Sequence, residues 1–299
     1  MALELKYRPD SLESLVGNKQ TVVQLTGLFE DEEHKHSIML SGPRGCGKTT
    51  IARILAKDSG CKEVQELNIA NMRGIDTARE IVKHVKAMPM FGGNKAIILD
   101  EVHMGTKEFF NAILKSLEEP PSHVYFFLCT TDPHQVLGTV KSRCAQYVVS
   151  PLTKKQTKVL LNDIILKEGL DIAEEALDII VENSDGIPRE AVIMLEQISN
   201  LLHKQQVLVS KKIKTTENTV KELCQALLAK KKWKVVSSLL KNLVKEDTER
   251  IRRAVLGYMT TVALNEDNLN AMVIIDCFKE PFFSSDRAGL ILACYQSVS

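Results

Sequence analysis

The sequence lacks the segments that would carry a chain into or across a membrane. Its first ten residues, MALELKYRPD, contain no apolar signal-peptide core, and no run of about 18 apolar residues occurs elsewhere. The seven cysteines form no CxxC pair, and their odd number and scatter favour reduced thiols over disulfides or a zinc site. We therefore expect a cytosolic protein without membrane contact.

An excess of charge of either sign is also missing. The formal net charge is +1, so any contact with nucleic acid has to come from locally placed lysines and arginines. Glycine and proline are too few to indicate disorder, and 44% of the residues are hydrophobic. At 299 residues the chain can hold two or three domains, each with its own core.

Short apolar runs in the first half of the chain predict buried strands. Residues 38–41, 96–99 and 124–129 are continuous apolar segments separated by helical patterning, and two weaker candidates begin at Val64 and Gln146. Continuous rather than alternating hydrophobicity is typical of strands covered on both faces. We therefore predict a parallel sheet in an α/β fold.

The remainder of the chain has a helical pattern. Helical stretches are expected near 154–167, 174–183 and 189–204, and after a polar stretch, SKKIKTTENT, apolar residues keep helical spacing to about residue 262. We predict an α/β domain over 1–151, a small helical domain over 152–206 and an all-α domain of about five helices over 207–299.

A phosphate-binding motif follows the first predicted strand. GPRGCGKT, Gly42–Thr49, fits GxxxxGK[ST] and precedes a helical stretch, a context in which backbone N–H groups hold phosphate oxygens. Lys48 is expected to neutralise the β and γ phosphates of ATP, and Thr49 to bind Mg²⁺. The alternative is a glycine-rich turn without a ligand. The candidate nucleotide contacts here are Gly42, Pro43, Arg44, Gly45, Cys46, Gly47, Lys48, Thr49 and Thr50.

An acidic pair at the end of another predicted strand would complete this site. In AIILDEVH, four apolar residues are followed by Asp100 and Glu101. Asp100 is expected to hold the Mg²⁺ ion through water, and Glu101 to orient or deprotonate the attacking water. The alternative is an acidic cap on the next helix.

Several segments resemble one family, the AAA+ ATPase subunits of sliding-clamp loaders. KYRP with LVGNKQ, ELNIANMRGIDTAREIV, and the stretch from EVHMGTKEFF to KSRCAQY are similar to replication factor C small subunits and to the bacterial gamma/tau subunit. The resemblance covers roughly residues 3–200. The four-cysteine zinc module of the bacterial subunit is missing, and Cys61 stands alone in the corresponding stretch. No metal other than Mg²⁺ is therefore expected.

The resemblance implies roles for further residues. An amino-terminal segment would lie over the adenine, Thr130 would be the sensor 1 residue with Thr131 as the fallback, and Arg143 would enter the ATP site of a neighbouring subunit. Arg189 would be the sensor 2 residue on a helical lid. Without the resemblance, a capped turn and surface charges would explain Thr130 and both arginines. The implied adenine and ribose contacts are Tyr7, Arg8, Pro9, Val16 and Gly17.

In the family, ATPase-domain helices follow the DNA backbone. The local candidates are Arg73, Arg79, Lys83 and Lys107, although solvated helix faces explain them nearly as well. The exposed end of the helix around Phe109 would face the clamp.

The resemblance implies an ATP- and Mg²⁺-dependent motor that places a sliding clamp on primer-template DNA. It would assemble with other subunits as a pentamer through its carboxy-terminal helical collar, in the cytoplasm or at the nucleoid or nuclear site of replication. Two alternatives stay open: another AAA+ DNA-repair ATPase of the branch-migration type, and a non-hydrolysing scaffold subunit, whose usual sign is a damaged phosphate loop. A small-molecule kinase would leave Arg143 and Arg189 without purpose.

Overall fold

The computed structural model describes residues 2–30, 35–89, 92–211, 216–244, 246–265, 268–282 and 285–298. The chain divides into two compact units, one formed by Met1–Glu182 with Gly186–Val207 and the other by Asn183–Asp185 with Leu208–Ser299. The boundary at 151/152 within the first unit stays a prediction.

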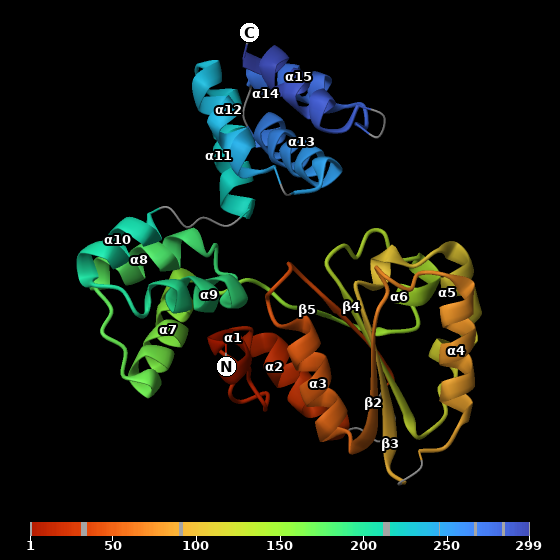
Figure 1. Ribbon diagram of the computed structural model, residues 1–299. Coiled ribbons are helices and arrows are strands. Elements are labelled where there is room, and N and C mark those ends of the chain that lie inside the picture. Colours follow the sequence, from red (N-terminus) through yellow and green to blue (C-terminus); the bar gives the residue numbers. More distant parts are fainter. Residues whose placement is uncertain are drawn as a thin grey trace. The chain divides into compact units, whose positions relative to one another are not determined.

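The first unit is built on a parallel five-stranded sheet (Figure 1). Its order is β2-β3-β4-β1-β5, and all five predicted strands are confirmed. The three central strands are almost wholly buried, as their continuous apolar runs predicted, whereas β2 and β5 alternate in burial because each forms an edge. The strands are β1 (Ser37–Ser41), β2 (Cys61–Asn68), β3 (Asn94–Asp100), β4 (Val124–Thr130) and β5 (Ala145–Val148).

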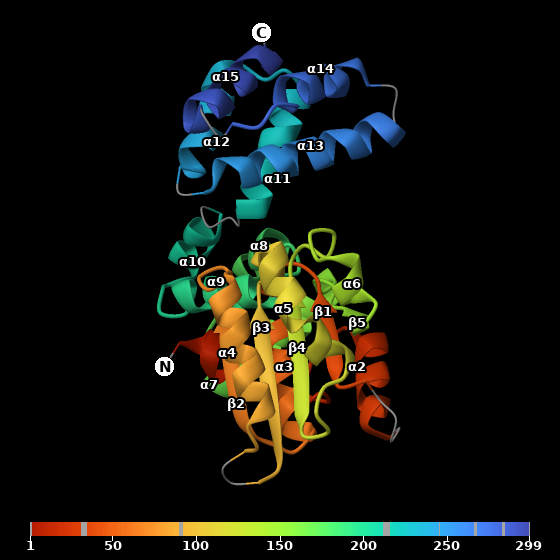
Figure 2. The same ribbon diagram turned by 90° about the vertical axis from the view of Figure 1, so that its right-hand side faces the viewer.

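Helices cover both faces of the sheet, each over its own apolar core. One face carries α2 (Lys19–Thr26) and α3 (Lys48–Asp58), and the other carries α4 (Ile75–Lys86), α5 (Lys107–Glu118) and α6 (Gly138–Lys141). Figure 2 shows α4 and α5 in front of the sheet. The chain up to β5 also contains three short helical elements, α1 (Leu3–Lys6), η1 (Gly27–Glu30) and η2 (Val102–Met104).

Four helices lie between β5 and residue 211: α7 (Lys154–Glu168), α8 (Glu174–Asn183), α9 (Pro188–Ile198) and α10 (His203–Ser210). The start of α7 is fixed by a capping box, in which the Thr153 hydroxyl accepts from the Gln156 N–H and the Gln156 side chain accepts from the Thr153 N–H. The single helix predicted over 189–204 is wrong. The chain turns after Ile198, where the Ser199 hydroxyl donates to the Glu196 carbonyl, and a new helix begins at His203.

The second unit packs five helices, α11 to α15, around one apolar core in the described residues. Part of the polar stretch before α11, residues 212–215, lies outside the described residues. Arg252 is largely buried and donates to the carbonyls of Phe278 and Lys279 at the end of α14. The helices are α11 (Thr216–Leu228), α12 (Trp233–Asn242), α13 (Thr248–Asn265), α14 (Leu269–Phe278) and α15 (Asp286–Val298).

The cysteines pack mainly as small apolar side chains. Five of the seven are buried and all are free thiols. Burial raises the pKa of the Cys144 thiol to about 12, which keeps it protonated at neutral pH. In the described part of the chain, no helix combines the length and the apolar character that a membrane span requires.

Candidate nucleotide-binding site

The phosphate loop connects β1 to α3, as the motif predicts. Gly45 and Gly47 have φ angles of +77° and +99°, the left-handed region that glycine adopts without strain. Gly42 has no room for a side chain, since a Cβ atom would lie 2.0 Å from the Val149 carbonyl oxygen. The glycines are therefore required both by the turn and by the close approach of the segment after β5.

Lys48 and Thr49 begin α3 at the loop. The Lys48 side chain is buried, and its Nζ donates to the carbonyls of Gly42 and Pro43, each at 2.9 Å. The Thr49 hydroxyl donates to Oδ2 of Asp100 at 3.0 Å. A hydroxyl and a carboxylate from two elements thus meet beside the loop. Such hard oxygen ligands suit Mg²⁺.

Glu101 follows Asp100 in a strained backbone conformation, with a φ angle of +50°. Its Oε2 accepts a hydrogen bond from the Thr131 hydroxyl at 3.0 Å and lies 3.5 Å from Nδ1 of His103. The side chain that we expect to act on water is therefore held at the edge of the sheet where β3 and β4 end.

The two candidate sensor threonines have different surroundings. The Thr130 side chain is fully buried, and its hydroxyl lies 3.1 Å from Nδ1 of His103 and accepts from the Asp132 N–H at 3.1 Å. Thr131, rather than Thr130, directly contacts Glu101. The geometry therefore favours the fallback residue for a role next to the carboxylate.

The amino-terminal segment packs against α7 and the chain after β5. The Tyr7 hydroxyl donates to Glu168, and this hydrogen bond raises the pKa of Tyr7 to about 12. Gly17 is buried against Leu152, and the side chain of Asn18 exchanges hydrogen bonds with the main chain of Ser150. The structure therefore brings this segment to the side of the sheet where the lid begins. Of its other predicted contacts, Pro9 and Val16 are half-buried.

Arg189 touches the phosphate loop with its main chain. Its N–H donates to the Gly45 carbonyl at 3.4 Å, while its Nε donates to Oε2 of Glu4 at 2.9 Å. This hydrogen bond lowers the pKa of Glu4. Arg8 is close by: partial burial and the charges of Arg53 and Arg189 lower the pKa of its guanidinium. Arg189 is therefore joined to the loop by its main chain, while its guanidinium is paired with Glu4 and interacts electrostatically with Arg8.

Arg143 is placed elsewhere. It follows α6, which covers the opposite face of the sheet from α3 (Figure 1). In the described residues its side chain donates to Glu118 and to the Thr139 carbonyl. These hydrogen bonds hold Arg143 away from the phosphate loop of its own chain, and its action on a neighbouring subunit stays a prediction.

The four predicted DNA contacts are all exposed and lie on or beside α4 and α5. The Arg73 carbonyl accepts the Thr106 N–H at 3.1 Å, so the loop before α4 meets the start of α5 and brings Arg73 near Lys107. Arg79 is paired with Asp76 at 3.1 Å. The charge of Arg79 is therefore partly balanced by Asp76, and the role of all four residues in DNA binding stays a prediction.

Sequence analysis missed several side chains that contact predicted site residues, among them Glu4, Asp76, His103, Glu118 and Glu168. His103 could have been noticed, since it stands two positions after Glu101 in DEVH. Glu4 and Arg189 are 185 positions apart, and Glu118 and Arg143 are 25 apart. No local pattern predicts such pairs.

A parallel sheet of this order, a glycine-rich loop between β1 and α3, an acidic pair after β3 and a helical lid define a P-loop ATPase of the AAA+ class.

Comparisons with known proteins agree with this class. The model of the family described as DNA polymerase III, delta subunit, matches residues 68–153, and that of the Rad17 P-loop domain matches residues 4–99. Among solved structures, the RuvB Holliday junction branch migration motor of Thermotoga maritima superposes with a TM-score of 0.58 at 17% identity, covering 74% of this chain and 79% of that one. At this identity the likeness shows the fold alone.

Similarity to curated proteins narrows the AAA+ class to one group of relatives. The chain is 34% identical over 222 residues to DNA polymerase III subunit gamma of Buchnera aphidicola subsp. Schizaphis graminum, which is 67% of this chain and 61% of the relative. It is also 34% identical over 219 residues to DNA polymerase III subunit tau of Bacillus subtilis, 66% and 39% of the two chains. The chain is therefore an AAA+ protein related to the clamp-loader ATPase subunits, and that resemblance is confirmed. It spans less than two thirds of these relatives' length.

Proposed function

We propose that the protein is an ATPase subunit of a sliding-clamp loader. It uses ATP binding and hydrolysis to open a ring-shaped clamp and place it on primer-template DNA during replication, at the cytoplasmic or nucleoid site of synthesis. Its turnover depends on the clamp and on primed DNA.

The observation that carries this proposal is an intact hydrolytic site within a sequence related to gamma and tau. Lys48 donates to carbonyls of the loop, the Thr49 hydroxyl donates to Asp100, and Glu101 accepts from the Thr131 hydroxyl. A scaffold subunit that had lost hydrolysis would have no need for Lys48, Thr49, Asp100 and Glu101 together.

The residues divide the chemistry of phosphoryl transfer. Loop N–H groups and Lys48 bind the β and γ phosphates, and Thr49 with Asp100 would hold Mg²⁺. The bound ion supplies charge neutralisation at the transferring phosphoryl group. Glu101 orients the attacking water and accepts its proton, while Thr131 fixes the carboxylate in place. Arg189 adds positive charge from the lid, and Arg143 acts on the neighbouring subunit's nucleotide.

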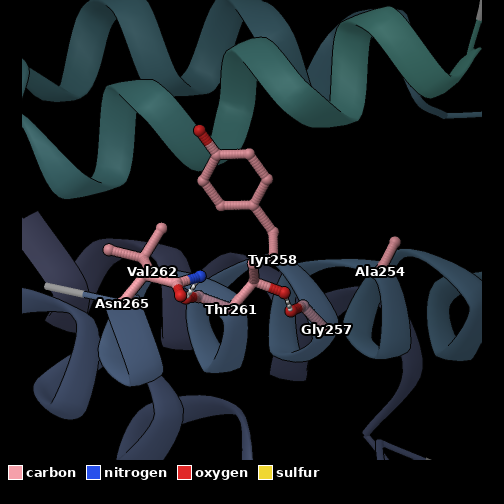
Figure 3. A pocket seen from close by; sticks show the side chains of 6 residues that line it. All are labelled: Ala254, Gly257, Tyr258, Thr261, Val262 and Asn265. Carbon is pink, nitrogen blue, oxygen red and sulfur yellow. Dashed lines mark hydrogen bonds between the residues drawn. The ribbon is translucent and has the colours of Figure 1, made fainter.

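The partners follow from the same relation: the sliding clamp, primer-template DNA and other subunits in a pentamer. The helical second unit is proposed as the collar through which subunits assemble. Support comes from exposed apolar side chains on its last two helices. It also comes from a shallow hollow along α13, where Tyr258 stands out among smaller side chains (Figure 3). The exposed apolar residues are Leu269, Met272, Val273, Ile291, Leu292 and Tyr295.

The decisive experiment compares ATP hydrolysis with and without clamp and primed DNA, for wild type and Arg143→Ala, in the complex of this chain with its companion subunits. We expect stimulated hydrolysis in wild type and its loss in Arg143→Ala, with nucleotide binding kept. Unchanged turnover in the variant would remove the proposed role of Arg143.

The same assay separates the alternatives. Hydrolysis that drives DNA strand exchange without any clamp would indicate a branch-migration motor, whose fold this chain shares. Tight ATP binding without turnover under any condition would indicate a scaffold subunit.

A further inference from the structure

The guanidinium of Arg143 is held by three hydrogen bonds, two of them along its Nε–Nη2 edge. Its Nε and Nη2 groups both donate to Oε2 of Glu118, at 3.0 and 2.9 Å, and Nη1 donates to the Thr139 carbonyl at 2.7 Å. A guanidinium carries five N–H groups. Within the described part of the chain, one N–H on Nη1 and one on Nη2 therefore remain for an outside acceptor.

Both ends of this contact are anchored. Glu118 ends α5, and the Leu117 carbonyl before it accepts a hydrogen bond at 3.0 Å from the hydroxyl of Ser37, a buried residue at the start of β1. On the other side, the Arg143 N–H donates to the Val140 carbonyl at 3.1 Å, and the next residue, Cys144, is buried. The elements that carry Glu118 and Arg143 are thus anchored, α5 to β1 through the Ser37 hydroxyl and the segment of Arg143 to α6 through the Val140 carbonyl.

Stability of the fold does not explain the pair. The side chains are 27% (Arg143) and 55% (Glu118) exposed, and ion pairs at such positions contribute little to the free energy of folding. What the contact does determine is where the guanidinium points.

We propose that Glu118 is a positioning residue for Arg143, which keeps the outer Nη1–Nη2 edge directed at the nucleotide of the neighbouring subunit. This rests on the role proposed above for Arg143. A free arginine side chain loses much rotational freedom when it docks, and one already held by a carboxylate loses less. The open edge matches two oxygens of a phosphate group, a geometry that arginine binds well.

The test uses three variants of the full chain in the complex with its companion subunits, clamp and primed DNA. Glu118→Ala should lower the stimulated kcat roughly tenfold, because the reacting geometry is no longer fixed, while the KM for ATP stays unchanged. Glu118→Gln should keep most of the turnover, because a single oxygen accepts both N–H groups and an amide oxygen can replace it. Glu119→Ala, which removes the same charge one position later, should match wild type.

A double-substitution cycle makes the outcome clear even where a single variant assembles poorly. In an Arg143→Ala background, Glu118→Ala should cause no further loss of kcat, whereas an equal loss in both backgrounds would overturn the proposal. Full turnover of Glu118→Ala alongside an inactive Arg143→Ala would also overturn it and leave the proposed function standing. If Arg143→Ala is itself fully active, the role of Arg143 in the proposed function fails instead.

Discussion

At the scale of single residues, the candidate nucleotide site depends on a few side chains that are held in place by hydrogen bonds at the phosphate loop. The buried Lys48 side chain donates two hydrogen bonds to carbonyls of the loop, and the Thr49 hydroxyl donates to the Asp100 carboxylate. Sequence analysis predicted these residues because they belong to two short, recognisable patterns, the Gly42–Thr49 motif and the acidic pair at the end of β3. A phosphate loop is local, so its motif is enough to place it.

Lys48→Ala should abolish nucleotide binding at ordinary concentrations. Removal of a charged hydrogen-bond donor from the phosphates is expected to weaken binding by at least roughly 10- to 100-fold. A fluorescence titration with labelled ATP measures this, and Lys57→Ala, an exposed lysine on the same helix, serves as the matched control. Wild-type affinity in Lys48→Ala would contradict the assignment of the loop.

The two threonines after β4 should respond differently to valine. Thr131→Val should keep its stability and lose roughly 10- to 100-fold in turnover, because Glu101 loses its hydrogen-bond donor. Thr130→Val should instead destabilise the fold by about 1–3 kcal/mol, since the Asp132 N–H loses its acceptor. Chemical denaturation and ATPase rates, measured on both variants, separate the two roles. A stable but inactive Thr130→Val would support Thr130 as the sensor 1 residue.

At the scale of elements, the sequence predicted all five strands and most helices, but not every boundary. The continuous apolar runs of β1, β3 and β4 are a direct result of cover on both faces. The break between α9 and α10 was missed because apolar spacing continues through it while Ser199 turns the chain. Long-range pairs such as Glu4 with Arg189 were unpredictable, since both residues read locally as surface charges.

The capping box of α7 makes the lid's first helix a testable element. Thr153→Ala should lower the free energy of unfolding by about 1 kcal/mol, because the Gln156 N–H loses its side-chain acceptor. Urea denaturation followed by circular dichroism measures the change. Lys155→Ala, an exposed position in the same first turn, should change stability very little. Equal stability of Thr153→Ala and wild type would contradict the cap.

At the scale of the whole molecule, each compact unit has its own core, and this should be visible during unfolding. The only tryptophan of the chain, Trp233, lies in the second unit and packs edge-on against Tyr295 at 5.2 Å. Tryptophan fluorescence therefore reports on the second unit alone, whereas circular dichroism reports on both.

We expect the two signals to give different unfolding midpoints in urea, because the cores do not share residues. Residues 208–299, expressed alone, should reproduce the fluorescence transition of the full chain. Coincident midpoints together with an unfolded fragment would show that the units depend on each other for stability.

The close approach of Val149 to Gly42 separates two kinds of constraint on the phosphate loop. Lys48 is expected to bind the phosphates of a ligand, whereas Gly42 is required by the chain's own backbone whether or not a ligand is bound. In a related protein that no longer binds ATP, Lys48 can be replaced without loss of function. Gly42 should still be present, because any side chain there would collide with Val149. Its presence in a degenerate relative would thus testify to shared architecture and not to surviving activity.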